Sequence, residues 1–471
     1  MITSSSGPFF ADKYRMKCKY FFLAVLCGFM LNQAAAQTRP TPVILEEIYE
    51  LLSEFNFSEA IALFDTIGPS DAESTPIMLL RASVLNSAGR TNDARRLIEA
   101  VSVREPENLE ALYVLSVIEA MSGKSREQRT ILEKIISINP RHVNALSDLG
   151  SNYLQTRSFS NATGYFDKAL EVDPGNLNAL LGKAAIYRFA RDPYNAEAML
   201  NLAVSFHPEE AGPYHERARL YLGAGFPIQA LADLDKARDL DRYDYSIAID
   251  RGNTLLDLYR KEQALEEFER AVSINPREYL AYAFTAGIKD EFGDYDGAER
   301  DYEILARLKP DYYFAFEGVG IHKMRRGQWA EARDAFMEVY RQAPNEYYYA
   351  LLAAVCWMRA DNLAGPRQFL NQVMSKVRRD SIEYYIIRLF YDLTGRVYNG
   401  ENDMLRRVDA EQNPETKARM LFYLGQYYDV RGNQNLANRY FSQSGELNKR
   451  SLPEWRLNDW ICIDRGLVAI R

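Results

Sequence analysis

The residue types that most often perform chemistry are few in this chain, and their spacing is unsuited to catalysis. There are only four histidines, and none is placed with the spacing of a metalloprotease motif or a zinc site. His142 and His207 each lie close to a proline, in a short segment that predicts a turn, where we expect solvated side chains. The chain also contains no Gly-x-Ser-x-Gly segment of the kind that presents a serine nucleophile.

Phosphate and cofactor motifs are equally incomplete. The sequence Gly-Lys-Ser at 123–125 resembles the end of a phosphate-binding loop, but Ile118 stands where that loop requires a glycine. Gly318 and Gly320 lack the third glycine of a dinucleotide loop and fall inside a predicted helix. Carboxylate pairs such as Glu266–Glu267 are common on helix surfaces. The sequence therefore predicts a protein that is not an enzyme and has no catalytic, cofactor-binding or metal-binding residues.

A proline that recurs every 34 residues indicates what the chain is instead. Arg242 occupies the one position within this span where the proline is missing. A fixed period of about 34 residues is typical of a solenoid in which each unit is one helix–turn–helix. The prolines of this register are Pro106, Pro140, Pro174, Pro208, Pro276, Pro310 and Pro344.

One period, 143–176, shows how each unit is built. Apolar or small residues follow one another at the spacing of a single helix face, first in one helix and then in a second. Gly150 and Ala162 are small where two helices would cross closely, and Pro174 ends the unit because proline cannot continue a helix. The residues that define the pattern are Leu146, Leu149, Gly150, Tyr153, Ala162, Phe166, Ala169 and Pro174.

This pattern resembles the tetratricopeptide repeat family and continues over roughly residues 41–450. The resemblance implies an all-α fold, a right-handed α-solenoid of about 11–12 helix–turn–helix repeats that ends in a C-terminal capping helix. Each repeat packs only on its neighbours, so we expect one elongated array from 37 to 450. Its expected units are 41–74, 75–108, 109–142, 143–176, 177–210, 211–244, 245–278, 279–312, 313–346, 347–380, 381–417 and 418–450.

The register has local departures. Gln128 and Pro366 replace the alanine of the second helix in their units, and the latter predicts a helix that begins near that proline. The unit 381–417 is longer than the others, which predicts an irregular joint near 396–416. Residues 451–471 leave the register; we expect them to form a capping helix, with a docking tail as the alternative.

The N-terminal residues 1–36 have the order of a secretory signal peptide. A basic region precedes the apolar run Tyr20–Leu31, and the small residues Ala34–Ala36 follow it. This run is shorter than the ~20 residues of a transmembrane helix, so no transmembrane span is predicted. Met16 would begin a more typical signal than Met1. We therefore expect an exported protein, periplasmic or associated with the outer envelope, and possible bacterial lipidation of Cys27 is an open alternative.

Charge and cysteine content narrow the possible partners. The chain has 57 Lys and Arg against 65 Asp and Glu, and removal of residues 1–36 takes away four basic residues and one acidic residue, which leaves a net charge of −11. Such a chain is not expected to be a general binder of nucleic acid or anionic membranes. Beyond the signal only Cys356 and Cys462 remain, and we expect packed thiols rather than a disulfide framework.

The resemblance implies a concave groove that is lined by the first helix of each repeat. Inward-facing residues would occupy the second, fifth, ninth and twelfth positions of each unit. The groove would be polar and partly basic in its centre, then aromatic and apolar, although these side chains could instead pack between repeats. The lysines of a chaperone-type carboxylate clamp are missing. The candidate partner-binding residues are Arg188, His215, Arg219, Asn253, Phe314, Glu317, Tyr348, Leu351 and Met358.

The function that follows is a non-enzymatic scaffold of the cell envelope that binds protein or peptide partners in this groove. An envelope-anchored lipoprotein or surface adhesin is a second possibility, and a regulatory subunit of an envelope-assembly enzyme complex is a third. Each of these would depend on export.

The exported chain is expected to begin at Gln37, because the small residues before it suit signal cleavage. Intact-mass measurement of the protein purified from native envelopes checks this. A chain that begins at Cys27 and carries a diacylglycerol would contradict it and would establish the lipoprotein.

Overall fold

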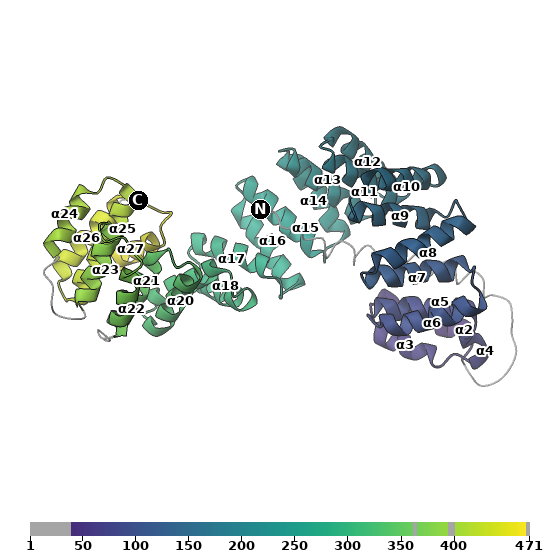
Figure 1. The fold of residues 1–471 in the computed structure, drawn as a ribbon, viewed down its shortest axis with the longest axis horizontal. Helices are drawn as coiled ribbons and strands as arrows, with labels where there is room; N and C mark the ends of the chain where they lie inside the picture. Colours follow the sequence, from purple (N-terminus) through teal and green to yellow (C-terminus); the bar gives the residue numbers. More distant parts are fainter. Residues whose placement is uncertain (1–38, 361–364, 394–400, 468–471) are drawn as a thin grey trace. The chain divides into compact units, whose positions relative to one another are not determined.

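The computed structural model describes residues 39–360, 365–393 and 401–467. Within these ranges the regular structure is entirely helical, which makes the chain an all-α solenoid (Figure 1). None of the helices in the described ranges combines the length and apolar character needed to cross a bilayer. The predicted signal peptide, with Cys27, lies outside the described residues.

The chain divides into two compact units, Met1–Leu240 and Asp241–Arg471. The division follows α14, at the inter-repeat turn in which Arg242 replaces the recurring proline. Both units are built from helices.

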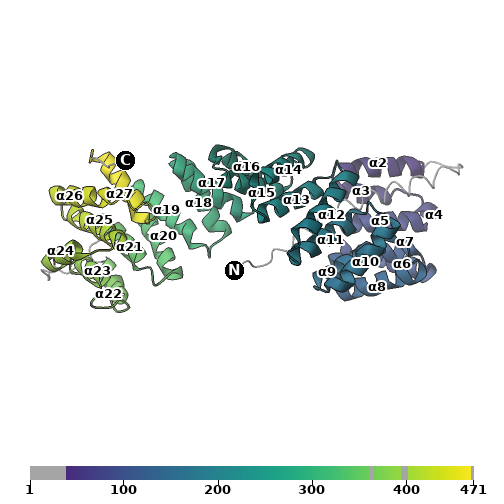
Figure 2. The same ribbon diagram turned by 90° about the horizontal axis from the view of Figure 1, so that it is seen from above.

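The first unit is a succession of antiparallel helix pairs in sequence order (Figure 2). Each pair contacts the next, as a solenoid requires. Its helices are α2 (Thr41–Ser53), α3 (Phe57–Phe64), α4 (Pro69–Ala72), α5 (Thr75–Ser87), α6 (Thr91–Arg104), α7 (Leu109–Met121), α8 (Ser125–Ile138), α9 (Val143–Gln155), α10 (Phe159–Val172), α11 (Leu177–Phe189), α12 (Pro193–Phe206), α13 (Ala211–Gly223) and α14 (Pro227–Leu240).

A buried side chain of the second helix holds each pair together: it is aromatic on α3 and α10, and it is isoleucine or leucine on α6, α8, α12 and α14. Phe166 on α10 is 0% exposed and lies against glycines of two first helices. A Cβ atom placed on Gly150 of the same repeat would approach the Phe166 ring to 2.5 Å, and one on Gly182 of the next repeat to 2.2 Å. Any larger residue would collide with the ring, so the small positions of the register set how closely the helices approach.

The turns between repeats are closed by side chains that cap the next first helix. Asn108 and Asn176 accept hydrogen bonds from the backbone N–H groups of Ala111 and Ala179, at 2.9 and 3.1 Å. His142 does the same for α9: its Nδ1 accepts from the Ala145 N–H at 3.2 Å. The histidine expected to be merely solvated is therefore a helix cap, and burial lowers its pKa.

The second unit begins with the same pairs and then becomes irregular. α22 begins at Gly365, next to Pro366, and α24 is a short helix within the region where the joint was expected; residues 394–400 of that region lie outside the described residues. Its helices are α15 (Tyr245–Asp257), α16 (Lys261–Ile274), α17 (Tyr279–Phe292), α18 (Tyr295–Leu308), α19 (Tyr313–Arg325), α20 (Trp329–Gln342), α21 (Tyr347–Arg359), α22 (Gly365–Met374), α23 (Ile382–Leu393), α24 (Glu401–Ala410), α25 (Pro414–Val430), α26 (Gln434–Glu446) and α27 (Pro453–Asp464).

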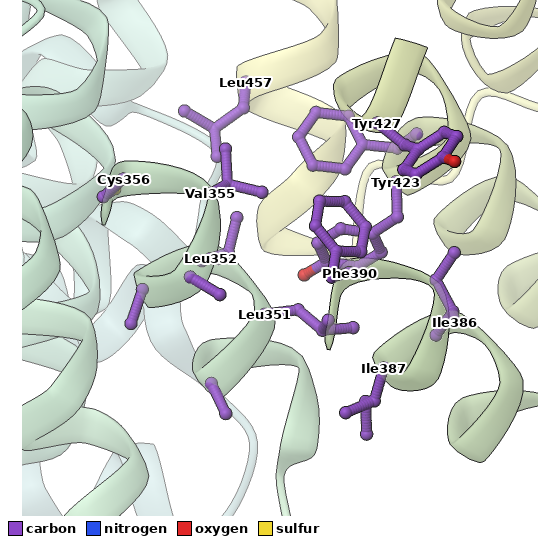
Figure 3. Packing of buried hydrophobic residues seen from close by; sticks show 14 of the residues in the cluster. Leu351, Leu352, Val355, Cys356, Ile386, Ile387, Phe390, Tyr423, Tyr427 and Leu457 are labelled. Carbon is purple, nitrogen blue, oxygen red and sulfur yellow. The ribbon is translucent and has the colours of Figure 1, made fainter. Parts of the chain in front are cut away.

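Contacts between distant helices set the second unit apart. α21 contacts α23 and α25 besides its chain neighbours, and α27 contacts α19 as well as α25 and α26. Figure 3 shows the resulting core, in which Leu351 and Val355 of α21 face Phe390 of α23 and Tyr423 of α25. Two first helices of this unit, α19 and α21, are therefore contacted by later parts of the same chain.

Candidate protein-binding groove

In the first unit, the predicted groove positions of α9 and α11 remain partly accessible. Asn144 and Arg188 are exposed, and Asn178 is half-buried. The next layer is buried: Asp148 is 4% exposed and accepts a 2.8 Å hydrogen bond from the Tyr113 hydroxyl. Accessible amide and guanidinium groups thus lie above a firmly held polar layer.

Arginines from α11 and α13 meet at one carboxylate. Arg188 Nη1 lies 2.8 Å from Glu216 Oε2, and Arg219 Nη1 lies 3.4 Å from Glu216 Oε1. The Arg188 side chain keeps 40% of its surface exposed while Glu216 keeps 14%. His215, which was predicted to line the groove, is only 5% exposed and contributes to the interior instead. The structure brings Arg188 and Arg219 together at the Glu216 carboxylate.

Asn253 lies on α15, half-buried, in the second unit. Phe314 on α19 is 48% exposed, and its ring stacks on Tyr313 with centroids 4.1 Å apart. Of the predicted groove residues in the later repeats, it is the most exposed aromatic.

The prediction that Leu351 and Met358 line an accessible groove is wrong. They are 0% and 3% exposed, because α23 and α25 pack across α21. Neither side chain is available to a partner in this structure. The apolar strip that the sequence predicted to be a binding surface is part of the hydrophobic core of the second unit.

Tyr348 is also occupied within the chain. Its hydroxyl donates to Glu383 Oε1 at 3.1 Å, and the Arg419 guanidinium lies 3.8 Å from its ring centroid. Burial raises its pKa above the ordinary value. The side chain joins α21 to α23 and α25 rather than to solvent.

The sequence reasoning missed a buried polar cluster where α25 and α27 meet α21. Glu454 of α27 is 1% exposed, lies 3.2 Å from Arg419 and accepts a 2.9 Å hydrogen bond from the Tyr423 hydroxyl. The same hydroxyl lies 2.9 Å from the Tyr348 carbonyl oxygen. The only sign of this cluster in the sequence is Glu454, a charged residue among the tryptophan and aliphatic residues that follow the repeat register.

α27 is also held from its other side. Arg456 Nη1 lies 2.6 Å from Asp290 Oδ1 of α17, and the Trp460 ring packs edge-on against Tyr295 with centroids 5.1 Å apart. The residues after 450 therefore form a helix that closes the second unit, with an ion pair to a residue 166 positions earlier.

Glu317, a predicted groove residue, lies near Glu454 and Arg419 of this cluster, and its pKa is shifted. Burial raises its pKa above 4.5, while the hydrogen bond from the Tyr349 hydroxyl opposes the shift; Glu454 adds to the rise and Arg419 opposes it. Among the residues that the structure describes, no group of three or more His, Cys, Asp or Glu side chains could hold a metal ion. The cluster serves packing and charge balance within the unit.

Glu317→Gln is expected to raise the free energy of unfolding at neutral pH, by about 1 kcal/mol as for many single substitutions. A raised carboxyl pKa means that Glu317 stabilises the fold most when protonated, and this contribution is lost as the pH rises through the folded-state pKa. Glutamine removes the charge and keeps an acceptor for Tyr349. Denaturant unfolding at neutral and acidic pH measures the difference.

Glu317→Ala is the control, because it removes the acceptor as well and should destabilise the protein at both pH values. The account is wrong about the charge if Glu317→Gln is less stable than the native chain at neutral pH. The advantage of glutamine should disappear below about pH 4.5, where an unfolded glutamate is also protonated.

Comparison with known proteins agrees with this architecture. A tetratricopeptide repeat family model matches residues 79–142, 249–313 and 288–344. A tetratricopeptide repeat protein from Parabacteroides merdae is 21% identical over 51% of this chain and 96% of that chain, with a TM-score of 0.41. PilF from Pseudomonas aeruginosa is 19% identical over 44% of this chain and 94% of its own, with a TM-score of 0.39.

The Cut9 and Hcn1 assembly of the APC/C contains a chain that is 17% identical over 72% of this protein and 66% of its own length, with a TM-score of 0.42. The matched segments lie in both units, and the helix pairs there share a register of small and bulky apolar residues. The chain therefore contains tetratricopeptide repeats at residues 79–142 and 249–344.

Proposed function

We propose that this chain is a non-enzymatic scaffold of the cell envelope that binds protein or peptide partners along the first helices of its first unit. The match of these segments to a family of interaction scaffolds supports the general role. The signal-like order of residues 1–36 is the support for the envelope location.

One observation carries the choice of surface. Groove positions on α9 and α11 are exposed at Asn144 and Arg188, whereas the equivalent positions on α21 are sealed by α23 and α25. A partner can therefore reach these side chains of α9 and α11 without displacing another helix of the first unit. The accessible side chains of α9 and α11 are polar, so this surface differs from an apolar groove that binds a helix.

The chemistry of these side chains favours an extended peptide. The amides of Asn144 and Asn178 can donate to and accept from a peptide backbone, and Arg188 offers a guanidinium group to a carboxylate. Asp148 and Tyr113 fix the layer beneath them, so little side-chain ordering is needed on binding. An extended segment with an acidic residue is the ligand that this surface fits.

Site-specific photocrosslinking in native cells tests the surface directly. A photoreactive amino acid at Asn144 or Arg188 should yield a covalent adduct with a protein partner. The same amino acid at Lys168, an exposed position on the second helix α10, is the matched control and should not.

The partner is then identified from the adduct, and a peptide from it is titrated against the purified chain. Arg188→Ala should weaken that binding about tenfold, as expected for loss of one charged hydrogen bond. Adducts that form at Lys168 alone, or binding that Arg188→Ala leaves unchanged, would contradict the assignment.

A further inference from the structure

The turns between the two helices of each repeat carry exposed apolar side chains in the first unit. Tyr194 is 81% exposed, Ile228 71%, Phe189 61% and Phe226 51%. They belong to two consecutive turns, α11 to α12 and α13 to α14. Side chains of this size gain free energy when they leave water, so their exposure at loop tips calls for a surface that covers them.

Neighbouring turns lie close enough to act together. Phe159, which begins α10, packs on Phe189 with ring centroids 5.4 Å apart, so the turn of one repeat contacts that of the next. Arg157 and Arg191 occupy the same place in their turns with φ values of 56° and 57°. We call this row of turns, residues 121–127, 155–160, 189–195 and 223–229, the turn edge.

The turn edge is basic as well as aromatic. Lys124, Arg126, Arg157 and Arg191 are all exposed there. Its acidic residues are only Glu127 and Asp192, and the latter is engaged as the cap of α12, where it accepts from the Asn195 N–H at 3.1 Å. The basic side chains lie in the first three turns and the most exposed apolar side chains in the last two, and both kinds meet in the turn 189–195.

The opposite edge of the same unit has the reverse character. Its inter-repeat turns, residues 139–142, 173–176 and 207–210, hold three acidic residues against one arginine. Each of these turns contains a proline, and Phe206 beside them is partly engaged because its ring covers Gly175. The two edges therefore differ in the sign of their charge, although Phe206 leaves one exposed aromatic side chain on the acidic edge.

We propose that the turn edge docks on the surface of an anionic phospholipid bilayer. Aromatic and aliphatic side chains on loop tips would enter the headgroup region, and the arginines would pair with lipid phosphates. A row of turns presents these groups side by side along one edge, which suits a flat surface. The site differs from the groove of the proposed function, so the protein could hold a partner while on the membrane.

The overall charge of the chain restricts which of its surfaces can face an anionic bilayer. The array from residue 37 onward is acidic, so most of its surface is repelled by anionic lipid. Only a locally basic surface can approach such a bilayer, and the turn edge is one. Oriented docking, rather than general membrane affinity, is what the charge distribution supports.

Vesicle flotation tests the proposal with the chain from Gln37 onward, so that the apolar run Tyr20–Leu31 is not present. The probes are vesicles of phosphatidylglycerol with phosphatidylethanolamine, and vesicles of phosphatidylcholine alone. We expect flotation with the anionic vesicles, weaker flotation with the neutral ones, and release as ionic strength rises.

Two variants remove the two parts of the turn edge separately. F226S/I228S should weaken binding by at least about tenfold, because two inserted apolar side chains are lost. R157N/R191N should weaken it about 25-fold, at roughly fivefold per basic residue, and asparagine tolerates the positive φ at both positions. V103S/I138S, at exposed apolar positions near the opposite edge, is the control and should float like the parent chain.

The proposal is overturned if the parent chain does not float with anionic vesicles, or if both variants float as well as it does. A loss that V103S/I138S shares would also overturn it. If F226S/I228S instead lowers the sedimentation mass of the protein without lipid, the edge is a contact between copies. If the variants lose a protein partner while no vesicle is bound, the edge is a protein interface. Circular dichroism confirms that each variant is folded.

Discussion

The structure depends on one repeated contact, in which an aromatic ring of the second helix fits over small residues of first helices. Phe166 makes this contact with Gly150 and with Gly182 of the following repeat. The same arrangement recurs where Phe268 meets Gly252 and where Phe441 meets Gly425. Because a single ring joins two helices and often two repeats, local packing is enough to propagate the array.

This packing fixes how the helices of a pair meet, but it does not determine whether the other face of a first helix is exposed or buried. In the first unit the repeats follow one another regularly, and polar groups such as Arg188 remain accessible. In the second unit the register is interrupted, and α25 and α27 return to α21 and α19. The buried Glu454 of the pair with Arg419 also accepts a hydrogen bond from the Tyr423 hydroxyl, and buried charges are tolerated when they are paired and hydrogen-bonded in this way. One family of repeats therefore produces an open surface and a closed one.

The helix pairs could be read from the sequence because their determinants lie within one or two repeats. The period of Pro174 and its equivalents, and the pairing of Gly150 with Phe166, are local. The roles of Leu351 and Met358 could not be read in this way, since their burial results from helices tens of residues later in the chain. Arg456 was likewise unassigned, because its partner Asp290 is 166 positions away. Whether a predicted groove position is exposed depends on such non-local contacts.

The first helices α9 and α11 are open where α21 is covered, and thiol labelling of introduced cysteines distinguishes the two surfaces. Cys356 and Cys462 are both buried at 0% exposure, so the native thiols provide an internal reference for closed sites; burial also raises the pKa of the Cys356 thiol to about 12. The account predicts that Asn144→Cys and Arg188→Cys react rapidly with a maleimide in the folded protein, whereas Leu351→Cys reacts only after denaturation. Rapid labelling of Leu351→Cys in the folded protein, with Cys356 still unreactive, would show that the second groove is open and would contradict the account.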